Sequence, residues 1–210
     1  MTIAVLADDV LKKELLSKPV APGIDLVWAD SVRSLAIIDA DVFMDLLFEY
    51  NPERTATLKQ LQSKPVFLNA VTYSTKTIGG GFIRINAWPT LLQRNISEVA
   101  IESEEQQQTV QRVFDKLQWQ YKIVPDVPGM ITARVLAMII NEAYYTLEAD
   151  VSTREEIDTA MKLGTNYPLG PFEWSETIGL LRVYELLKEL SRTDSRYTPA
   201  PLMEKEVMTK

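Results

Sequence analysis

The sequence contains neither cysteine nor histidine in 210 residues. Without cysteine the chain has no disulfide bond and no thiolate ligand, and without either residue type we expect no metal site. The missing histidine also removes the side chain that most often acts as a general base near neutral pH. A reaction that depends on a histidine base is therefore excluded.

Long apolar runs and an excess of positive charge are also missing. No stretch approaches the roughly eighteen apolar residues of a membrane-spanning helix, and residues 1–8 lack the cationic start of a secretory signal. The 22 basic and 29 acidic residues give a net charge of −7, which disfavours nucleic acid because phosphate binding needs clustered Lys and Arg. The sequence thus predicts a cytoplasmic protein that binds neither membranes nor nucleic acid.

The chain divides into two parts of different character. Hydrophobic residues make up 46% of it, enough for a sizeable core. Residues 1–125 mix strand and helix patterns, whereas residues 126–210 are helical in pattern and carry more of the negative charge. Two prolines and a glycine within residues 125–129 are typical of a turn between domains. We expect one domain at 1–125 and a second at 126–210.

The first part alternates strand and helix patterns. This alternation predicts an α/β domain with a reduced Rossmann-like, doubly wound and largely parallel sheet. Strands are expected at 2–7, 24–29, 41–47, 65–70, 82–88, 96–101 and 120–124, and helices at 8–17, from 31, at 52–62 and at 104–117.

The first strand–helix turn has the outline of a dinucleotide site without its chemistry. Such turns need glycine so that the pyrophosphate can approach the helix N-terminus, but residues 6–11 contain none. Asp8 and Asp9 stand there instead. A carboxylate about 4 Å from a pyrophosphate charge repels it by roughly 4 kcal/mol at an effective dielectric of 20, so these residues oppose NAD bound in the usual pose. Asp30, after the second strand, can be a ribose partner or a helix cap. Gly79–Gly81 leads into a strand, so we expect a connecting turn and not a phosphate loop.

The second part predicts an all-α domain. Apolar residues cover more than one stripe of the helix expected at 130–147, so this helix needs cover on more than one side. Ser152 or Thr153 can cap a following helix, Gly164 is expected to end it in the left-handed conformation, and residues 168–171 form a rigid turn into another helix.

A set of spaced residues in this second part resembles the C-terminal domain of the 3-hydroxyacyl-CoA dehydrogenase family, whose members oxidise the 3-hydroxyl of acyl-CoA thioesters with NAD. The resemblance implies a Rossmann-like NAD-binding domain, followed by a helical domain that forms a homodimer and helps enclose the acyl chain. The residues that carry it are Asp158, Ala160, Met161, Gly164, Pro168, Gly170, Pro171 and Phe172, with Pro128-Gly129, Asn141–Ala143 and Pro199–Leu202.

The resemblance also places the family's site residues on this chain. The catalytic histidine falls on Asn86 and its glutamate partner on Glu98, while a shifted register puts Ile85 at the base position. None of these positions offers the histidine base, and Glu98 can equally be a solvent-facing strand residue. The helper asparagine falls on Ala133.

On the cofactor side, the resemblance implies binding positions at Asp30 and Glu49, with Arg54 where the family has a lysine. Two functions follow. One is a catalytically degenerate, dimeric binding or scaffold protein without a cofactor, which can keep a site for an acyl-CoA-like small molecule. The other is an active NAD-dependent oxidoreductase of fatty-acid metabolism with an atypical base.

Overall fold

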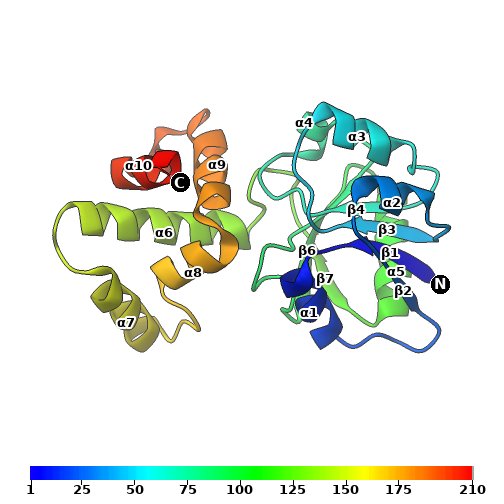
Figure 1. Ribbon diagram of the computed structural model, residues 1–210, viewed down its shortest axis with the longest axis horizontal. Helices are drawn as coiled ribbons and strands as arrows, with labels where there is room; N and C mark the ends of the chain where they lie inside the picture. The colour runs from blue at the N-terminus through cyan, green and yellow to red at the C-terminus, as the bar shows by residue number, and fades with distance from the viewer. Residues whose placement is uncertain (210) are drawn as a thin grey trace. The chain divides into compact units, whose positions relative to one another are not determined.

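The computed structural model describes residues 1–209 and divides into two compact units, Met1–Met130 and Ile131–Lys210 (Figure 1). The predicted boundary at residues 125–129 lies in the last residues of the first unit. No helix within residues 1–209 has the length and apolar character needed to cross a membrane.

A seven-stranded sheet forms the centre of the first unit, in the order β2-β1-β3-β4-β5-β6-β7. Strands β1 to β5 are parallel, β6 is antiparallel to β5, and β7 is parallel to β6. The predicted largely parallel, doubly wound α/β sheet is confirmed. The strands are β1 (Thr2–Leu6), β2 (Asp25–Ala29), β3 (Val42–Asp45), β4 (Val66–Leu68), β5 (Ile83–Ile85), β6 (Ile96–Ala100) and β7 (Gln120–Ile123).

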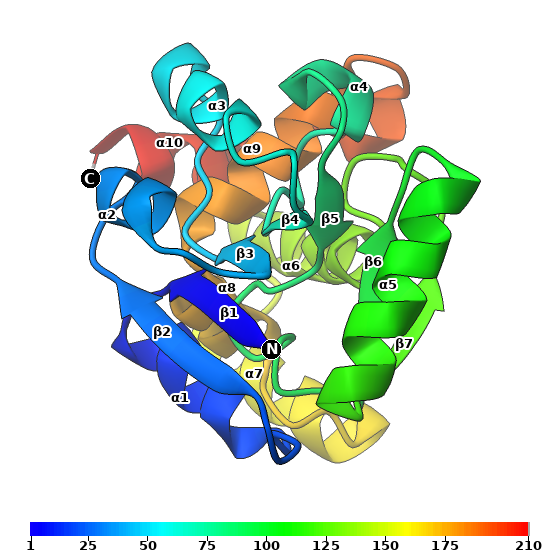
Figure 2. The same cartoon turned by 90° about the vertical axis from the view of Figure 1, so that its right-hand side faces the viewer.

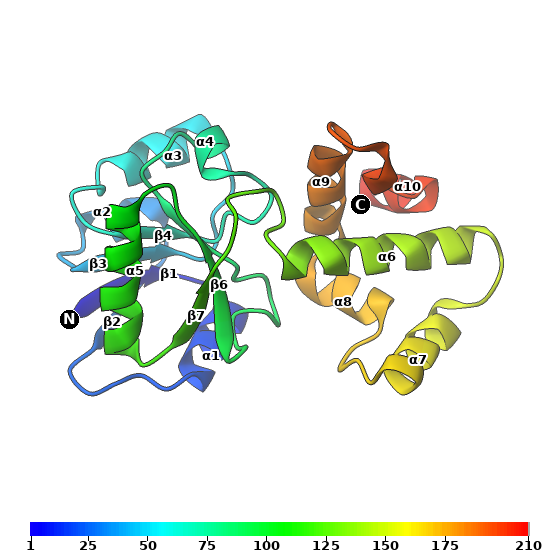
Figure 3. The ribbon, with the colours of Figure 1, turned by 180° about the vertical axis from the view of Figure 1, so that it is seen from behind.

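Five helices cover the two faces of this sheet (Figure 2, Figure 3). Leu11 of α1 and Phe114 of α5 pack into the core on one face. Leu35 of α2, Leu58 of α3 and Ile78 of α4 pack into the core on the other. The helices are α1 (Asp9–Ser17), α2 (Val32–Ile37), α3 (Pro52–Lys59), α4 (Thr75–Ile78) and α5 (Glu104–Leu117).

Polar side chains set where these helices begin. Each helix follows a residue whose side-chain oxygen accepts a hydrogen bond from the backbone N–H three residues later, which satisfies one of the unpaired amides of the first turn. The five capping residues are Asp8, Ser31, Asn51, Ser74 and Ser103.

The ends of β4 and β5 depart from the prediction because Asn69 takes over their pairing. Its side-chain amide donates to Leu46 O (2.9 Å) and Ala87 O (3.0 Å), and its oxygen accepts from Ala87 N (3.0 Å). Both strands are therefore shorter than the expected 65–70 and 82–88. The one-turn helix α4 was not predicted. Gly79–Gly81, all at positive φ, connect it to β5 as expected.

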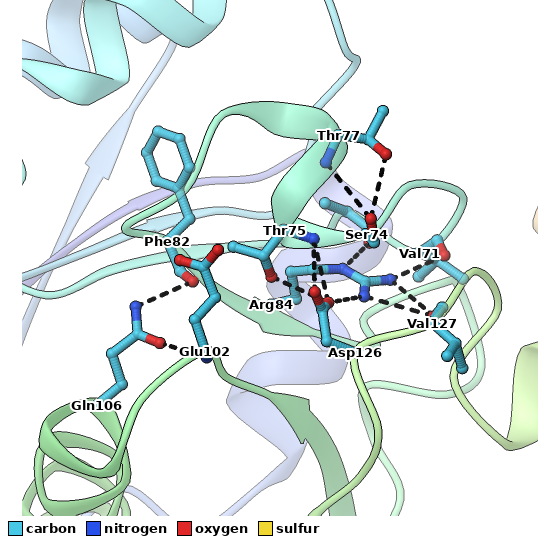
Figure 4. Close-up of polar contacts among 11 residues, drawn as sticks. Val71, Ser74, Thr75, Thr77, Phe82, Arg84, Glu102, Gln106, Asp126 and Val127 are labelled. Carbon is cyan, nitrogen blue, oxygen red and sulfur yellow. Dashed lines mark hydrogen bonds and ion pairs between the residues drawn. The ribbon is translucent and has the colours of Figure 1, made fainter.

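A buried ion pair joins β5 to the segment after β7 (Figure 4). Arg84 is completely buried, and its guanidinium lies 2.5 Å from the carboxylate of Asp126. It also donates to the carbonyls of Ala70 (2.7 Å) and Val71 (3.1 Å). Asp126 in turn accepts from the backbone N–H and hydroxyl of Thr75. One guanidinium thus fixes the loop after β4, the start of α4 and residues 126–127.

The second unit is all helical, as predicted. Helix α6 packs against α8, α9 and α10, and α7 packs against α8 (Figure 3). The elements are α6 (Thr132–Glu148), α7 (Arg154–Thr165), α8 (Pro171–Ile178), α9 (Leu180–Ser191), the 3₁₀ helix η1 (Ser195–Tyr197) and α10 (Pro201–Thr209).

The spaced residues of the sequence signature have structural roles here. The Asp158 carboxylate accepts from the N–H groups of Phe172 (2.8 Å) and Glu173 (3.2 Å), so it caps α8 from α7. Gly170 approaches it so closely that an added Cβ would lie 2.2 Å from the Asp158 carboxylate. Asn141 holds α6 to the turn before α10, because its amide donates to Thr198 O and accepts from Ala200 N.

The expected role of Gly164 is wrong. This glycine lies inside α7, and Asn166 takes the left-handed conformation (φ 56°) that ends the helix. Asparagine tolerates this conformation better than most residues, so the helix continues past the glycine.

Replacing Asp126 by alanine tests the buried ion pair. The change leaves the Arg84 charge buried without an opposite charge, which costs about 3–5 kcal/mol in the free energy of unfolding. Chemical denaturation measures this loss. The control is Arg33→Gln, because the Arg33–Glu53 pair is almost fully exposed and should contribute little. Equal effects of the two changes would contradict the assigned role.

Gly170→Ala and Gly164→Ala should change the free energy of unfolding of the second unit in opposite directions. Gly170→Ala forces a methyl group into the Asp158 carboxylate and should destabilise the unit by about 1–3 kcal/mol. Gly164→Ala meets no atom within 4 Å inside a helix and should stabilise it by about 0.5–1 kcal/mol. Urea unfolding of both variants checks the pair, and a neutral Gly170→Ala would reject the close approach.

Candidate functional site

The turn after β1 is closed by the protein's own carboxylate. The side chain of Asp8 accepts from Leu11 N (2.8 Å) and so occupies the N-terminus of α1, while Asp9 follows in the first turn. In a dinucleotide site this N-terminus faces the pyrophosphate, and glycines let it approach. The turn has no glycine, and the Asp8 carboxylate already binds one of its amides, the N–H of Leu11. Its residues do not fit NAD in the usual pose.

Asp30 follows β2 and is exposed, but it does not cap α2. Ser31 makes the cap, with its hydroxyl accepting from Ser34 N and the Ser34 hydroxyl accepting from Ser31 N. The expectation of Asp30 as a helix cap is therefore wrong. Serine takes this role because it lies one residue closer to the first helical turn.

The acidic residue that ends β3 is Asp45, which the sequence analysis missed. Arg54 of α3 forms two hydrogen bonds to its carboxylate, at 2.6 and 2.8 Å, and Asp45 is completely buried. Burial raises the pKa of Asp45, while the Arg54 guanidinium acts against that rise. Glu49 lies exposed in the loop beyond. The available signal was an aspartate at the end of an apolar strand and an arginine in the first turn of the next helix.

Asn86 and Glu98 lie side by side, twelve residues apart in sequence. The Asn86 side-chain amide donates to the Glu98 carboxylate (3.1 Å), and Asn86 N donates to Glu98 O (3.0 Å). Glu98 is a half-buried residue of β6. The Asn86 side chain is the hydrogen-bond donor in this pair, and an amide offers no base that could take up a proton.

The remaining candidate positions carry no polar side chain. Ile85 is completely buried in the core of the sheet. Ala133 is completely buried in α6 of the second unit and offers only a methyl group. Within residues 1–209, the Asn86 side-chain oxygen is buried and accepts no hydrogen bond.

Glu14 of α1 holds the loop that follows Asn86. Its carboxylate accepts from Thr90 N (2.6 Å), and Thr90 has a φ of 75°, a strained value for a β-branched residue. Burial raises the pKa of Glu14, against backbone N–H groups of this loop that lower it. Glu14 was not predicted from the sequence, because a buried glutamate in an amphipathic helix has the same local pattern as a solvent-exposed one.

No group of three or more acidic side chains within residues 1–209 is arranged to hold a metal ion. Asp45 is paired with Arg54, Glu98 with the Asn86 amide, and Glu14 with the backbone of Thr90.

Comparison with known proteins places the second unit in a family. Residues 129–210 match the family 3-hydroxyacyl-CoA dehydrogenase, C-terminal domain. A 3-hydroxybutyryl-CoA dehydrogenase of Bradyrhizobium diazoefficiens is 44% identical over 95 residues, which are 44% of this chain and 32% of the relative. A probable 3-hydroxybutyryl-CoA dehydrogenase of Bacillus subtilis is 33% identical over 160 residues, 74% of this chain and 55% of the relative.

Solved structures extend the likeness in fold to both units. The (S)-3-hydroxybutyryl-CoA dehydrogenase of Ralstonia eutropha superimposes with a TM-score of 0.75 at 20% identity, covering 99% of this chain and 93% of that one.

A further sequence relative, a 3-hydroxyadipyl-CoA dehydrogenase of Escherichia coli, is 41% identical over 87 residues, 40% of this chain and 18% of that protein. The chain thus covers little more than half, or less, of these curated relatives.

Glu14→Gln should change how stability depends on pH. Because its pKa is raised in the folded state, the folded protein holds a proton that the unfolded chain releases above its ordinary value of 4.5. This contribution to stability is full below that pH and is lost as the pH rises through the raised pKa. The difference between variant and wild type should therefore move in the variant's favour as the pH rises. Urea unfolding across pH checks this, and a difference that is constant with pH would contradict it.

Proposed function

The chain belongs to the 3-hydroxyacyl-CoA dehydrogenase family, and from this membership we propose that it has lost the dehydrogenase reaction and acts as a dimeric binding or scaffold protein. The proposed ligand class is an acyl-CoA-like small molecule, as the names of its relatives indicate.

The observation that carries the proposal is the Asn86–Glu98 pair. Oxidising a secondary alcohol removes a proton from its oxygen while hydride leaves the carbon, so the site needs a base. The Asn86 amide does not accept a proton near neutral pH and so cannot act as the base, and its N–H is directed at Glu98. Asn86 and Glu98 are in contact, but Asn86 cannot act as the base that a histidine would supply at this position.

The turn after β1 supports the same proposal independently. Asp8 caps α1 where a pyrophosphate would be bound, so a dinucleotide in the usual pose would meet a carboxylate. Hydride transfer needs an oriented acceptor as well as a base. Both requirements fail in the first unit.

Retention of the family signature is compatible with this loss of chemistry. Asp158, Gly170 and Asn141 act in capping and close packing of the second unit. Such residues are needed for folding whether or not the protein catalyses.

An exposed apolar stripe on α6 is the surface that we propose for homodimerisation. Ile131, Val135 and Tyr145 are all exposed, at helical spacing along one side of the helix. Exposed apolar surface of this kind marks interaction sites, and a second copy of the chain covers it symmetrically.

The alternative function is an active NAD-dependent oxidoreductase in which Glu98 replaces the histidine base. It requires Glu98 to reach the substrate hydroxyl and the cofactor to bind in a different pose. The following binding experiment distinguishes the two functions.

Calorimetric titration with NADH and with acetoacetyl-CoA, each alone, tests the proposal. We expect no NADH binding with Kd below about 1 mM, because Asp8 closes the pyrophosphate position, and measurable binding of the acyl-CoA. Tight NADH binding, or turnover of 3-hydroxybutyryl-CoA with NAD, would refute the degenerate function. As a further control, Asn86→His should not create turnover, since a base supplies only about 10²–10⁴-fold and the hydride acceptor stays unbound.

Val135→Glu should dissociate the homodimer. The change places a charge in the middle of the proposed interface, where burial without a partner is unfavourable. Light scattering should give a mass near twice 23.8 kDa for the wild type and near 23.8 kDa for the variant. Leu163→Glu, an exposed apolar position on α7, is the matched control and should stay dimeric. A monomeric wild type would reject the proposal.

A further inference from the structure

A cavity of about 230 Å³ in the first unit is lined by three short segments. Residues 17–19 end α1, residues 93–95 precede β6, and residues 118–120 connect α5 to β7. The volume corresponds to roughly seven or eight water molecules at about 30 Å³ each. It suits a small group of a few atoms and not a dinucleotide.

Lys18 lies at the base of this cavity and is almost completely buried, with 7% exposed. Its ammonium donates to Arg94 O (2.7 Å) and to the Ser97 hydroxyl (3.2 Å), and it lies 4.6 Å from the centre of the Trp119 ring. An ammonium has three N–H donors, and these two hydrogen bonds use two of them.

The acceptors around Lys18 are neutral. Among residues 1–209, no carboxylate forms an ion pair with it. Buried charges in proteins are normally paired with an opposite charge. Burial lowers the pKa of Lys18, as expected for an ammonium that lacks such a partner. Lys18 therefore differs from the buried Arg84, whose charge is neutralised by Asp126.

The rest of the cavity lining carries no negative charge either. It contains no aspartate or glutamate, although acidic residues outnumber basic ones in the whole chain. Its exposed rim carries Arg94 and amide side chains, which supply N–H donors. The amides are those of Gln93, Asn95, Gln118 and Gln120.

We propose that this cavity binds a small oxyanion, a phosphate or carboxylate group, with Lys18 at its base and Arg94 at its rim. The bound anion supplies the negative charge that Lys18 lacks. Its oxygens accept from the third ammonium N–H and from the rim amides, and hydrogen bonds to an ionised group are the stronger kind.

The three segments are also held together without a ligand, so the cavity is preformed. The Trp119 indole N–H donates to Pro19 O (2.8 Å), which fixes the α5–β7 corner against the end of α1. Lys18 fixes residues 94–97 against the same helix end. A preformed site loses little conformational entropy on binding.

Calorimetric titration of the full chain with sodium phosphate, and separately with sodium acetate, tests the proposal, with sodium chloride at equal ionic strength as reference. We expect saturable binding of an oxyanion and none of chloride. Lys18→Met should weaken that binding by at least about tenfold, because it removes a charged hydrogen-bond donor. Lys13→Met, an exposed lysine on the same helix, should leave the affinity unchanged.

Arg94→Glu provides a second variant that does not disturb the buried base of the cavity. It places a negative charge on the exposed rim and should also weaken binding by about tenfold or more. Binding of phosphate alone assigns the site to phosphate groups, and binding of acetate assigns it to carboxylates. No saturable binding to the wild type, or wild-type affinity in the Lys18→Met or Arg94→Glu variant, would overturn the proposal.

Discussion

The buried ion pair between Arg84 and Asp126 is the contact on which much of the first unit depends. A completely buried guanidinium has to be neutralised, and the opposite charge comes from a residue 42 positions later in the chain. Through this one contact β5, the loop after β4 and the segment after β7 hold each other in place (Figure 4). Asn86 lies two residues beyond Arg84, so the position of the candidate site also depends on this pair.

Buried charges elsewhere in the first unit are satisfied in different ways. Asp45 is paired with Arg54, Glu14 accepts from the backbone of a strained loop, and Lys18 has only neutral partners. Only the first is neutralised by an opposite side-chain charge. The other two keep part of their desolvation cost, which is tolerable where a proton or a bound ion can remove it. This difference separates Lys18 from the purely structural charges.

The two units keep different parts of a family's requirements. In the second unit, Asp158, Gly170 and Asn141 meet demands of capping and close approach that any folded version has to meet. In the first unit, the Asn86 amide donates to the Glu98 carboxylate, and the N-terminus of α1 is capped by Asp8. Packing constraints of this kind act on folding itself, whether or not a protein catalyses.

The sequence alone determined the local elements and the layered class of the fold. Helix α5 was predicted at its observed bounds, because a capping serine and a strong apolar periodicity are local signals. The short helix α4 and the Asn69 side-chain hydrogen bonds that end β4 and β5 were missed, and the Ser31 cap was assigned to Asp30. The helix cap is decided between two neighbouring polar residues, Asp30 and Ser31. The Asn69 hydrogen bonds depend on a partner that is distant in sequence. The family resemblance, and not a local pattern, implied that Asn86 and Glu98 are partners, and their side chains are hydrogen-bonded.

Only the tertiary structure decided which charges are buried and what neutralises them. Lys18 meets Arg94 O across 76 residues, and Arg84 meets Asp126 across 42. A lysine near a helix end and an arginine in a strand have many suitable partners in the sequence, and only the folded chain decides which of these partners lie within hydrogen-bond distance. The free energy of burying a charge depends on that distance, which periodicity and composition do not contain.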